Sequence, residues 1–234
     1  MNTVKTLFLN DFEKYANVVN KDSKVLEFDV PGQKIYQIDS DRPFRMKLAS
    51  KHEAANYTIS ATEFNVTVAG KIAVVDTDDL SKSVYAVLDE GNGTVHTLGV
   101  KAIDSINKKI TLTSSETGIT GTLKVYYLFL DGYYKIAWEA PLGSSTEIKS
   151  FMKGSLGDLN SKKIFESSYY LPYIALLDDF MLQVYVNAPV AVDFDNPLTF
   201  VEIPVIEFDK AEFEEIAASM GYSIEMVLEH QRKL

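Results

Sequence analysis

The residue types that most often carry catalysis are scarce in this sequence. Its three histidines, His52, His96 and His230, stand far apart along the chain. The sequence contains neither the HExxH spacing of a zinc hydrolase nor the GxSxG turn that exposes a serine nucleophile. It has no cysteine, which excludes disulfides, thiolate metal sites and cysteine nucleophiles. The sequence therefore predicts a protein that is not an enzyme.

Carboxylates are the reactive side chains that gather locally. They form four clusters: Asp39 and Asp41; Asp76, Asp78 and Asp79; Asp178 and Asp179; and Asp193 and Asp195. Oxygen-rich loops of this kind can hold calcium. None of the clusters matches the ligand series of an EF-hand, however, and aspartate is equally common in turns. We expect no metal, no cofactor and no catalytic residue, and a calcium-binding loop stays open as an alternative.

Composition indicates a folded globular chain that binds neither nucleic acid nor membranes. The formal net charge of −10 would repel a polyphosphate backbone. Mean hydropathy is −0.04, and the apolar run at residues 169–177 is far shorter than the roughly 20 residues of a spanning helix. The first residues lack the apolar stretch of a secretory signal, so we expect synthesis in the cytoplasm.

Most of the chain shows the two-residue alternation of β-strands. Three hairpins are predicted where two such runs flank turn-forming residues: 25–30 with 35–38 about Pro31-Gly32, 84–88 with 94–100 about Gly91-Asn92-Gly93, and 125–130 with 133–138 about Asp131-Gly132. The Asp-Gly turn is the strongest of these signals. Residues 143–168 are richer in Gly, Ser and Lys and predict a long exposed loop. The fold class predicted is mainly β, an antiparallel β-sandwich that could be a jelly roll.

Aromatic side chains are dense in the third predicted hairpin. They are Tyr126, Tyr127, Phe129, Tyr133, Tyr134 and Trp138. An exposed aromatic face could stack on sugars, but the alternation places large apolar side chains on both faces of the hairpin. We therefore expect these residues to lie in the core or in a subunit interface.

Both ends of the chain are predicted to be helical. Apolar residues spaced by three and four predict a short amphipathic helix within residues 3–19. At the other end, Asp209 can cap a helix that ends at Gly221, and Ser223 can cap a second helix. The chain is accordingly divided into an N-terminal helical arm at 1–20, a β-sandwich body at 24–208 and a C-terminal helical hairpin at 209–234. Within the body, a further boundary could fall near residues 140–168.

Two stretches resemble a known class of proteins. Residues 100–113, VKAIDSINKKITLT, and residues 121–129, GTLKVYYLF, resemble the strand-turn-strand sequences of virion structural proteins from tailed phages and related viruses. The resemblance implies a capsid or decoration subunit with a β-sandwich or jelly-roll fold, in which the chain ends serve as assembly arms.

The function expected is that of a viral structural protein. It would form a homo-oligomeric subunit of a capsid or a capsid-attached assembly, contact other virion proteins, and reach the virion after synthesis in the host cytoplasm. Its interface is predicted to use apolar side chains of the two chain ends: Leu7, Phe8, Phe12, Phe213, Ile216, Met220, Ile224, Val227 and Leu228. A carbohydrate-binding or adhesion module, with or without calcium, is the alternative. A hydrolase with an unidentified acid pair is the least favoured interpretation.

Overall fold

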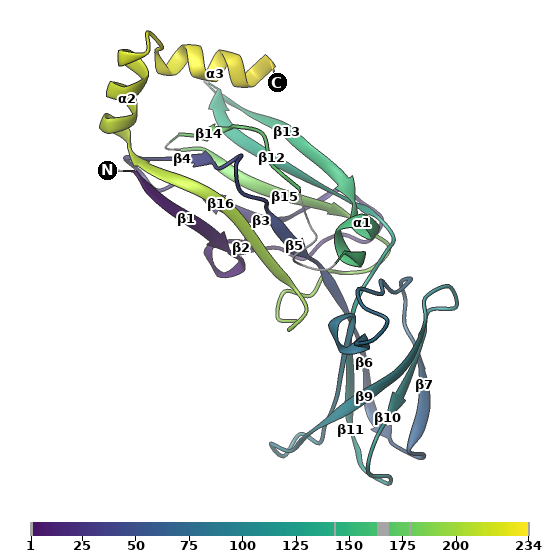
Figure 1. Ribbon diagram of the computed structural model, residues 1–234. Coiled ribbons are helices and arrows are strands. Elements are labelled where there is room, and N and C mark those ends of the chain that lie inside the picture. Colours follow the sequence, from purple (N-terminus) through teal and green to yellow (C-terminus); the bar gives the residue numbers. More distant parts are fainter. Residues whose placement is uncertain (1, 143, 163–168, 178, 234) are drawn as a thin grey trace.

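The computed structural model describes residues 2–142, 144–162, 169–177 and 179–233, and its fold is mainly β (Figure 1). The strands form three antiparallel sheets. Two of the sheets make up one part of the molecule, which we call the body and which comprises the described residues before 49 and after 128. The third makes up a second part, residues 49–128, which we call the lobe and which projects from one end of the body (Figure 1). The mainly β, antiparallel fold predicted from the sequence is confirmed.

The two sheets of the body are assembled from strands that are remote in the sequence. The first sheet contains β1 (Thr3–Phe8), β16 (Phe200–Asp209), β4 (Lys34–Ile38) and β14 (Ala175–Leu176) in that order, with β5 (Arg45–Lys47) also paired to β16. The second sheet contains β13 (Ser145–Ser155), β12 (Tyr133–Leu142), β15 (Met181–Asn187), β3 (Ser23–Asp29) and β2 (Glu13–Lys14). Both sheets thus join the first fifth of the chain to its second half.

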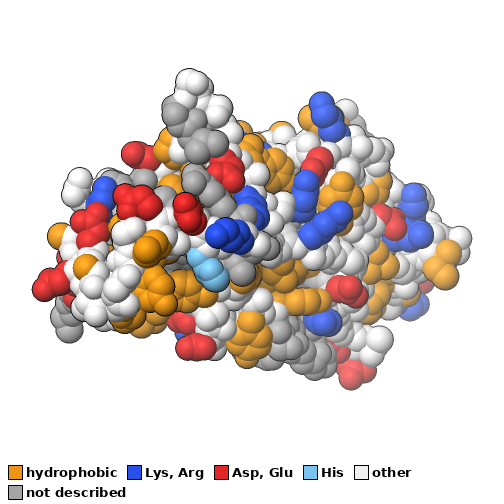
Figure 2. All heavy atoms as spheres, turned by 90° about the horizontal axis from the view of Figure 1, so that it is seen from above, with side chains coloured by type: hydrophobic (Ala, Val, Ile, Leu, Met, Phe, Trp, Pro, Cys, Tyr) orange, Lys and Arg blue, Asp and Glu red, His pale blue; other side chains and the backbone are white. Residues whose placement is uncertain are grey.

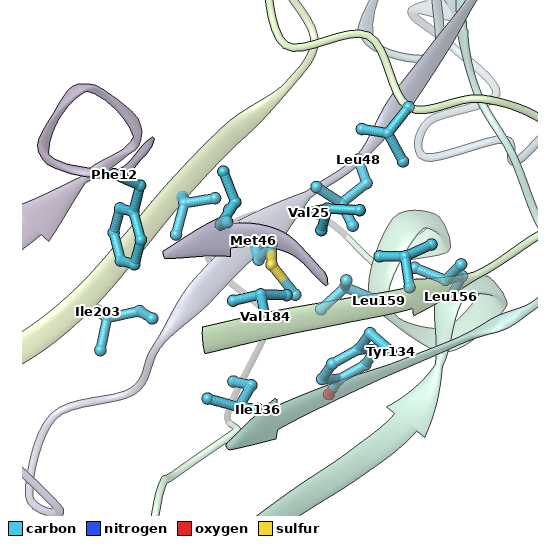
Figure 3. Packing of buried hydrophobic residues seen from close by; sticks show 14 of the residues in the cluster. Phe12, Val25, Met46, Leu48, Tyr134, Ile136, Leu156, Leu159, Val184 and Ile203 are labelled. Carbon is cyan, nitrogen blue, oxygen red and sulfur yellow. The ribbon is translucent and has the colours of Figure 1, made fainter. Parts of the chain in front are cut away.

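An apolar core fills the space between the two sheets of the body. Met46 and Ile203 come from strands of the first sheet, and Ile136 and Val184 come from strands of the second. All four belong to one buried cluster, in which Met46 lies over Val184 (Figure 3). Each sheet buries one face in this way, which is the packing of a β-sandwich.

The lobe is a single curled sheet whose buried side chains mostly belong to the same apolar cluster as the core of the body. Its strand order is β6 (Ala49–Thr58), β11 (Thr120–Leu128), β8 (Val84–Asp89), β9 (Val95–Asp104), β10 (Lys109–Thr113) and β7 (Glu63–Thr67). Its buried side chains include Phe64, Leu98, Ile110, Leu112 and Leu123. The chain enters the lobe at Ala49 and leaves it at Leu128, and these two residues are paired across β6 and β11.

The short helix α1 (Leu156–Ser161) fixes the junction between the body and the lobe. The side chain of Asn160 is wholly buried, and its amide nitrogen donates to the carbonyls of Leu48, at 2.9 Å, and Phe129, at 2.8 Å. Its oxygen accepts the backbone N–H of Leu48 at 3.1 Å. Lys47 donates to two carbonyls in the last turn of α1, both at 2.8 Å, and burial lowers the pKa of its ammonium group to about 8. Because Leu48 precedes the lobe and Phe129 follows it, one buried side chain ties both connections to α1.

One of the three predicted hairpins is confirmed and two are wrong. β8 and β9 pair as expected, with Ala86 opposite Leu98. The runs on either side of Pro31-Gly32 become β3 and β4, which lie in different sheets of the body. The runs on either side of Asp131-Gly132 become β11 in the lobe and β12 in the body. Gly132 has a φ of +117°. The predicted turn therefore does form a bend, but this bend leads the chain from the lobe into the body. Turn chemistry sets the local backbone, but the burial of each face decides which strands pair.

Two further segments differ from their predicted structure. The expected loop at 143–168 contains β13 and α1 instead, while residues 143 and 163–168 lie outside the described part of the chain. The helix predicted within residues 3–19 is also wrong, because Thr3 to Phe8 form β1, paired along its length with β16. Short 3-10 helices occur at Leu9–Asp11 and Leu80–Lys82. The β-branched residues of β1 favour a strand, and pairing with β16 outweighs the helical spacing.

The two C-terminal helices are confirmed as α2 (Lys210–Ser219) and α3 (Ile224–Lys233). Gly221, with a φ of +80°, follows the end of α2. The hydroxyl of Ser223 accepts the backbone N–H of Met226 at 3.3 Å and so caps α3. Asp209 stands before α2 as expected, but its carboxylate accepts from Lys34 Nζ at 2.7 Å instead of capping the helix. Among the described residues, no helix is both long and apolar enough to cross a membrane.

Candidate assembly surface at the C-terminal helices

Buried side chains hold the C-terminal helices against the body. Phe213 of α2 is buried, and its ring packs edge-on against Phe208 of β16, with centroids 5.4 Å apart. In α3, the buried amide of Gln231 donates to the carbonyl of Ala175 at 3.0 Å and accepts the N–H of the same residue at 2.6 Å. The side chain of Gln231 thus pairs with β14 as a neighbouring strand would, which fixes α3 on the body.

An apolar groove lies between these helices and the body. Its volume is about 1030 Å³, and its lining includes Tyr173, Phe213, Ile216, Met220, Tyr222 and Met226. Met220, Tyr222 and Met226 are 66%, 58% and 56% exposed. Figure 2 views the molecule from this end and shows hydrophobic side chains gathered next to acidic ones. Methionine and tyrosine are enriched at protein interfaces, where the first adapts its shape and the second offers a large surface with a polar tip.

The structure brings together part of the predicted interface. Phe213, Ile216, Met220 and Val227 all line the groove. Ile224 is half-buried against the core, and the side chain of Leu228 lies outside those that the structure describes. The remaining predictions sit elsewhere: Leu7 and Phe12 are buried in the core of the body, and Phe8 is exposed at the far end of β1. Of the predicted interface residues, only those of the C-terminal helices therefore line the groove.

The predicted interface did not include several groove residues, among them three large side chains, Tyr173, Tyr222 and Met226. Tyr222 lies in the turn after α2, and Met226 lies on α3. Both are large side chains within or next to the predicted helices, so their position in the sequence could have placed them in the predicted interface. Tyr173 comes from the segment before β14, more than thirty residues earlier in the chain. No local pattern connects such a residue to a helix, because only the folded body brings the two together.

The candidates for chemistry do not converge. His96 pairs with Glu90, its Nε2 lying 2.5 Å from Oε1, and neither His52 nor His230 is part of that pair. Three of the acidic clusters form turns, in which the second aspartate donates its backbone N–H to the first carboxylate, at 3.0 to 3.1 Å for Asp41, Asp78 and Asp195. Asp178, in the fourth, lies outside the described residues. Within the described ranges, no group of three or more histidines or acids is placed to hold a metal.

The dense aromatic segment is mostly core. Trp138, Tyr134, Tyr127 and Phe129 are each at most 2% exposed. The Trp138 ring stacks on Phe180 with centroids 5.6 Å apart. These side chains are therefore not available as a platform for stacking on sugars.

Comparison with known proteins identifies the class of fold. No protein-family model matches the sequence, and no curated protein matches it either. The structure does match solved structures of capsid proteins from a bacteriophage, and its antiparallel sheets resemble those of jelly-roll capsid proteins.

Two solved structures carry this likeness. One is VP17, a capsid protein of bacteriophage P23-77, with a TM-score of 0.67, 13% identity, and coverage of 88% of this chain and 95% of that one. The other is the complex of VP16 and VP17, the two major capsid proteins of the same phage. Its matching chain gives a TM-score of 0.66 at 14% identity, over 89% of this chain and 99% of that one. The resemblance to virion structural proteins drawn from the sequence is confirmed at the level of the fold.

Proposed function

We propose that the chain is a structural subunit of a virion, in a capsid or a capsid-attached assembly. The observation that carries the proposal is the fold match over 88% of the chain. The lobe makes up about a third of the sequence, so a match of this extent includes parts of both the body and the lobe. Shared architecture of two joined parts is more specific than a shared sandwich alone.

The mechanism proposed is burial of surface between subunits, with no catalytic step. The groove between α2, α3 and the body supplies the apolar part of one interface, since Met220, Tyr222 and Met226 present large side chains to solvent. Burying such side chains contributes roughly 25 cal/mol for each Å² of apolar surface removed from water. We propose that this groove contacts another copy of the chain or another virion protein. The net charge of −10 argues against direct contact with the genome.

The test is the mass of the purified protein in solution. We expect light scattering of the full chain to show an assembly larger than one copy. The double variant Met220→Glu/Met226→Glu should shift this mass toward the monomer, because it places two charges in the apolar groove. Val95→Glu is the matched control, since Val95 is 54% exposed in the lobe, and it should leave the mass unchanged. An assembly that the double variant leaves intact would contradict the role of the groove.

A further inference from the structure

The second sheet of the body has an outer face that carries charge in an ordered pattern. Across this face, Glu139 of β12 and Asp29 of β3 lie opposite Met181 of β15, which stands between them. Four residues further along β12 and β15, Lys135 of β12 and Lys24 of β3 lie opposite Tyr185 of β15 in the same way. We call these the acidic row and the basic row. They are roughly 13 Å apart, from the rise of four residues along a strand.

A network of hydrogen bonds holds the side chains between the two rows. The wholly buried Gln183 donates from its amide nitrogen to Glu27, at 2.6 Å, and to Glu139, at 2.5 Å. Tyr185 donates its hydroxyl to the Gln183 oxygen at 2.9 Å. Burial alone would raise the pKa of Glu27, but hydrogen bonds from Lys24, Gln183 and Tyr15 lower it. The hydrogen bond from Gln183 thus holds the carboxylate of Glu139 in place before any partner arrives, which reduces the entropy lost on binding.

The lysines of this face lie on tyrosine rings. Lys135 Nζ is 5.6 Å from the ring centre of Tyr185, and Lys153 Nζ, on the neighbouring strand β13, is 4.6 Å from that of Tyr133. Lys135 also pairs with Asp22. In the acidic row, by contrast, no ion pair with a lysine or arginine is formed by Glu139 or Asp29 among the described residues. The acidic row therefore has capacity for a basic partner.

The pattern is complementary to itself. If a second identical face is turned over about an axis that runs across the strands, between the two rows, each acidic row meets a basic row. Turned about an axis along the strands, each acidic row would meet an acidic row, which is repulsive. Two-fold contacts place the same patch on both partners, so the acidic and basic rows meet their electrostatic requirement. The rotation also brings Glu27, midway between the rows, opposite its own copy, but this carboxylate is buried and paired with Lys24.

We propose that this face binds a second copy of the chain about a two-fold axis that crosses the strands between the rows. Glu139 of one copy then faces Lys135 of the other, and Asp29 faces Lys24. The inference deepens the proposed function and rests on it, because it names one subunit contact of the assembly. It concerns a surface distinct from the groove at the C-terminal helices.

A charge-swap experiment tests the geometry. Lys135→Glu and Glu139→Lys are purified separately, in the Met220→Glu/Met226→Glu background that disables the groove, and their masses are measured by sedimentation at low ionic strength. Each alone makes two like-charged contacts, so its dimer dissociation constant should rise roughly tenfold or more relative to the background protein. An equimolar mixture of the two should dimerise again, because the mixed pair has two opposite-charged contacts. Added salt should weaken this dimer, since the charges are partly exposed.

Several outcomes would overturn the inference. A background protein that stays monomeric at low ionic strength, single variants that dimerise as well as their parent, or a mixture that fails to recover would each do so. Lys24→Glu and Asp29→Lys repeat the test at the second contact, which keeps it decisive if Lys135→Glu, placed beside Asp22, fails to fold. The role of the groove in the proposed function fails on a different readout: an assembly of the full chain that stays intact when the groove alone is changed.

Discussion

The lobe and the body are both built from antiparallel strands, but they differ in how far apart in the sequence the paired strands lie. In the lobe, β8, β9 and β10 follow one another in the sequence and lie side by side in the sheet. In the body, β12 lies beside β15, and β15 lies beside β3, more than a hundred residues away. Pairing of near neighbours loses little chain entropy, whereas pairing of remote strands must close long loops before any contact forms. The difference teaches that the body depends on its tertiary contacts more than the lobe does.

The largest expected effect would show whether the lobe unfolds on its own. Leu112→Ala removes a wholly buried side chain of the lobe and should lower the free energy of unfolding by about 2 to 5 kcal/mol. Trp138, the only tryptophan, lies in the body, so fluorescence reports on the body while far-ultraviolet circular dichroism reports on all strands. We expect the dichroism to change at a lower denaturant concentration than the fluorescence.

The exposed Lys109 lies on the same strand as Leu112, so Lys109→Ala serves as the control and should leave both signals where they are. If Leu112→Ala moved the two signals by the same amount, the lobe and the body would unfold as one unit. The contrast between the two parts would then not extend to their stability.

The second prediction concerns the junction. Asn160→Ala leaves the carbonyls of Leu48 and Phe129 without their buried donor and should cost about 2 to 3 kcal/mol. Because these carbonyls lie on the two connections to the lobe, the fluorescence and dichroism transitions should also separate. Asp158→Ala, at an exposed position of the same helix, is the control. Coincident transitions in Asn160→Ala would show that α1 does not couple the two parts.

A pair of glycines compares the junction with the far end of the lobe. Gly132 has a φ of +117°, and a Cβ there would lie 2.3 Å from the carbonyl oxygen of Asn187. Gly91 has a φ of +78°, and a Cβ there would meet nothing within 4 Å. Gly132→Ala should therefore cost about 2 kcal/mol and Gly91→Ala about 1 kcal/mol, both by denaturant unfolding. Equal losses would mean that backbone strain, and not the close contact in the body, sets the effect.

The smallest expected effect depends on pH. Hydrogen bonds from Lys5 and Tyr36 lower the pKa of Glu207 in β16 to about 2, from a usual 4.5. The unfolded chain binds this proton first, so the stabilisation is present above pH 4.5 and is lost as the pH falls toward 2. Glu207→Gln should lower stability at neutral pH by about 1 to 2 kcal/mol, because solvent screens its partly exposed partners, and should flatten the acid part of the curve.

The control for Glu207 is an exposed ion pair of the lobe. Glu63 pairs with Lys101, and both side chains are about half exposed. Glu63→Gln should produce no measurable change in stability between pH 2 and pH 7, since exposed pairs contribute little. A comparable acid-dependent loss in Glu63→Gln would show that the effect is not specific to the network in the body.

The contrast between near and remote pairing also explains which predictions from the sequence succeeded. The β8–β9 hairpin and the C-terminal helices follow from residues close together in the chain, such as Gly91 or Ser223, and both are confirmed. The N-terminal helix failed because the partner of β1 is β16, two hundred residues on. The Asp131-Gly132 hairpin failed because the two strands it joins belong to different sheets. The alternation of apolar residues predicts that a segment forms a β-strand, but it does not identify the strand with which it pairs.

The same limit applies to the candidate sites. The apolar faces of α2 and α3 were visible in the sequence because helical spacing is a local property. The acidic and basic rows were not visible in the sequence, since each row takes one residue from each of three strands. A shift of one residue in the register of a strand would move its side chain to the other face of the sheet. Surfaces built across strands become visible only when the pairing of the strands is known.

The pairing of Ala49 with Leu128 has a consequence for how this architecture can change. Residues opposite each other in an antiparallel pair have Cα atoms roughly 5 Å apart, a gap that a two-residue turn can close. The lobe is thus an insertion whose two ends meet at one point of the body. The lobe could be deleted, or replaced by a different domain, without changing the order of the strands in the body. Protein engineers could therefore insert a foreign domain at this position.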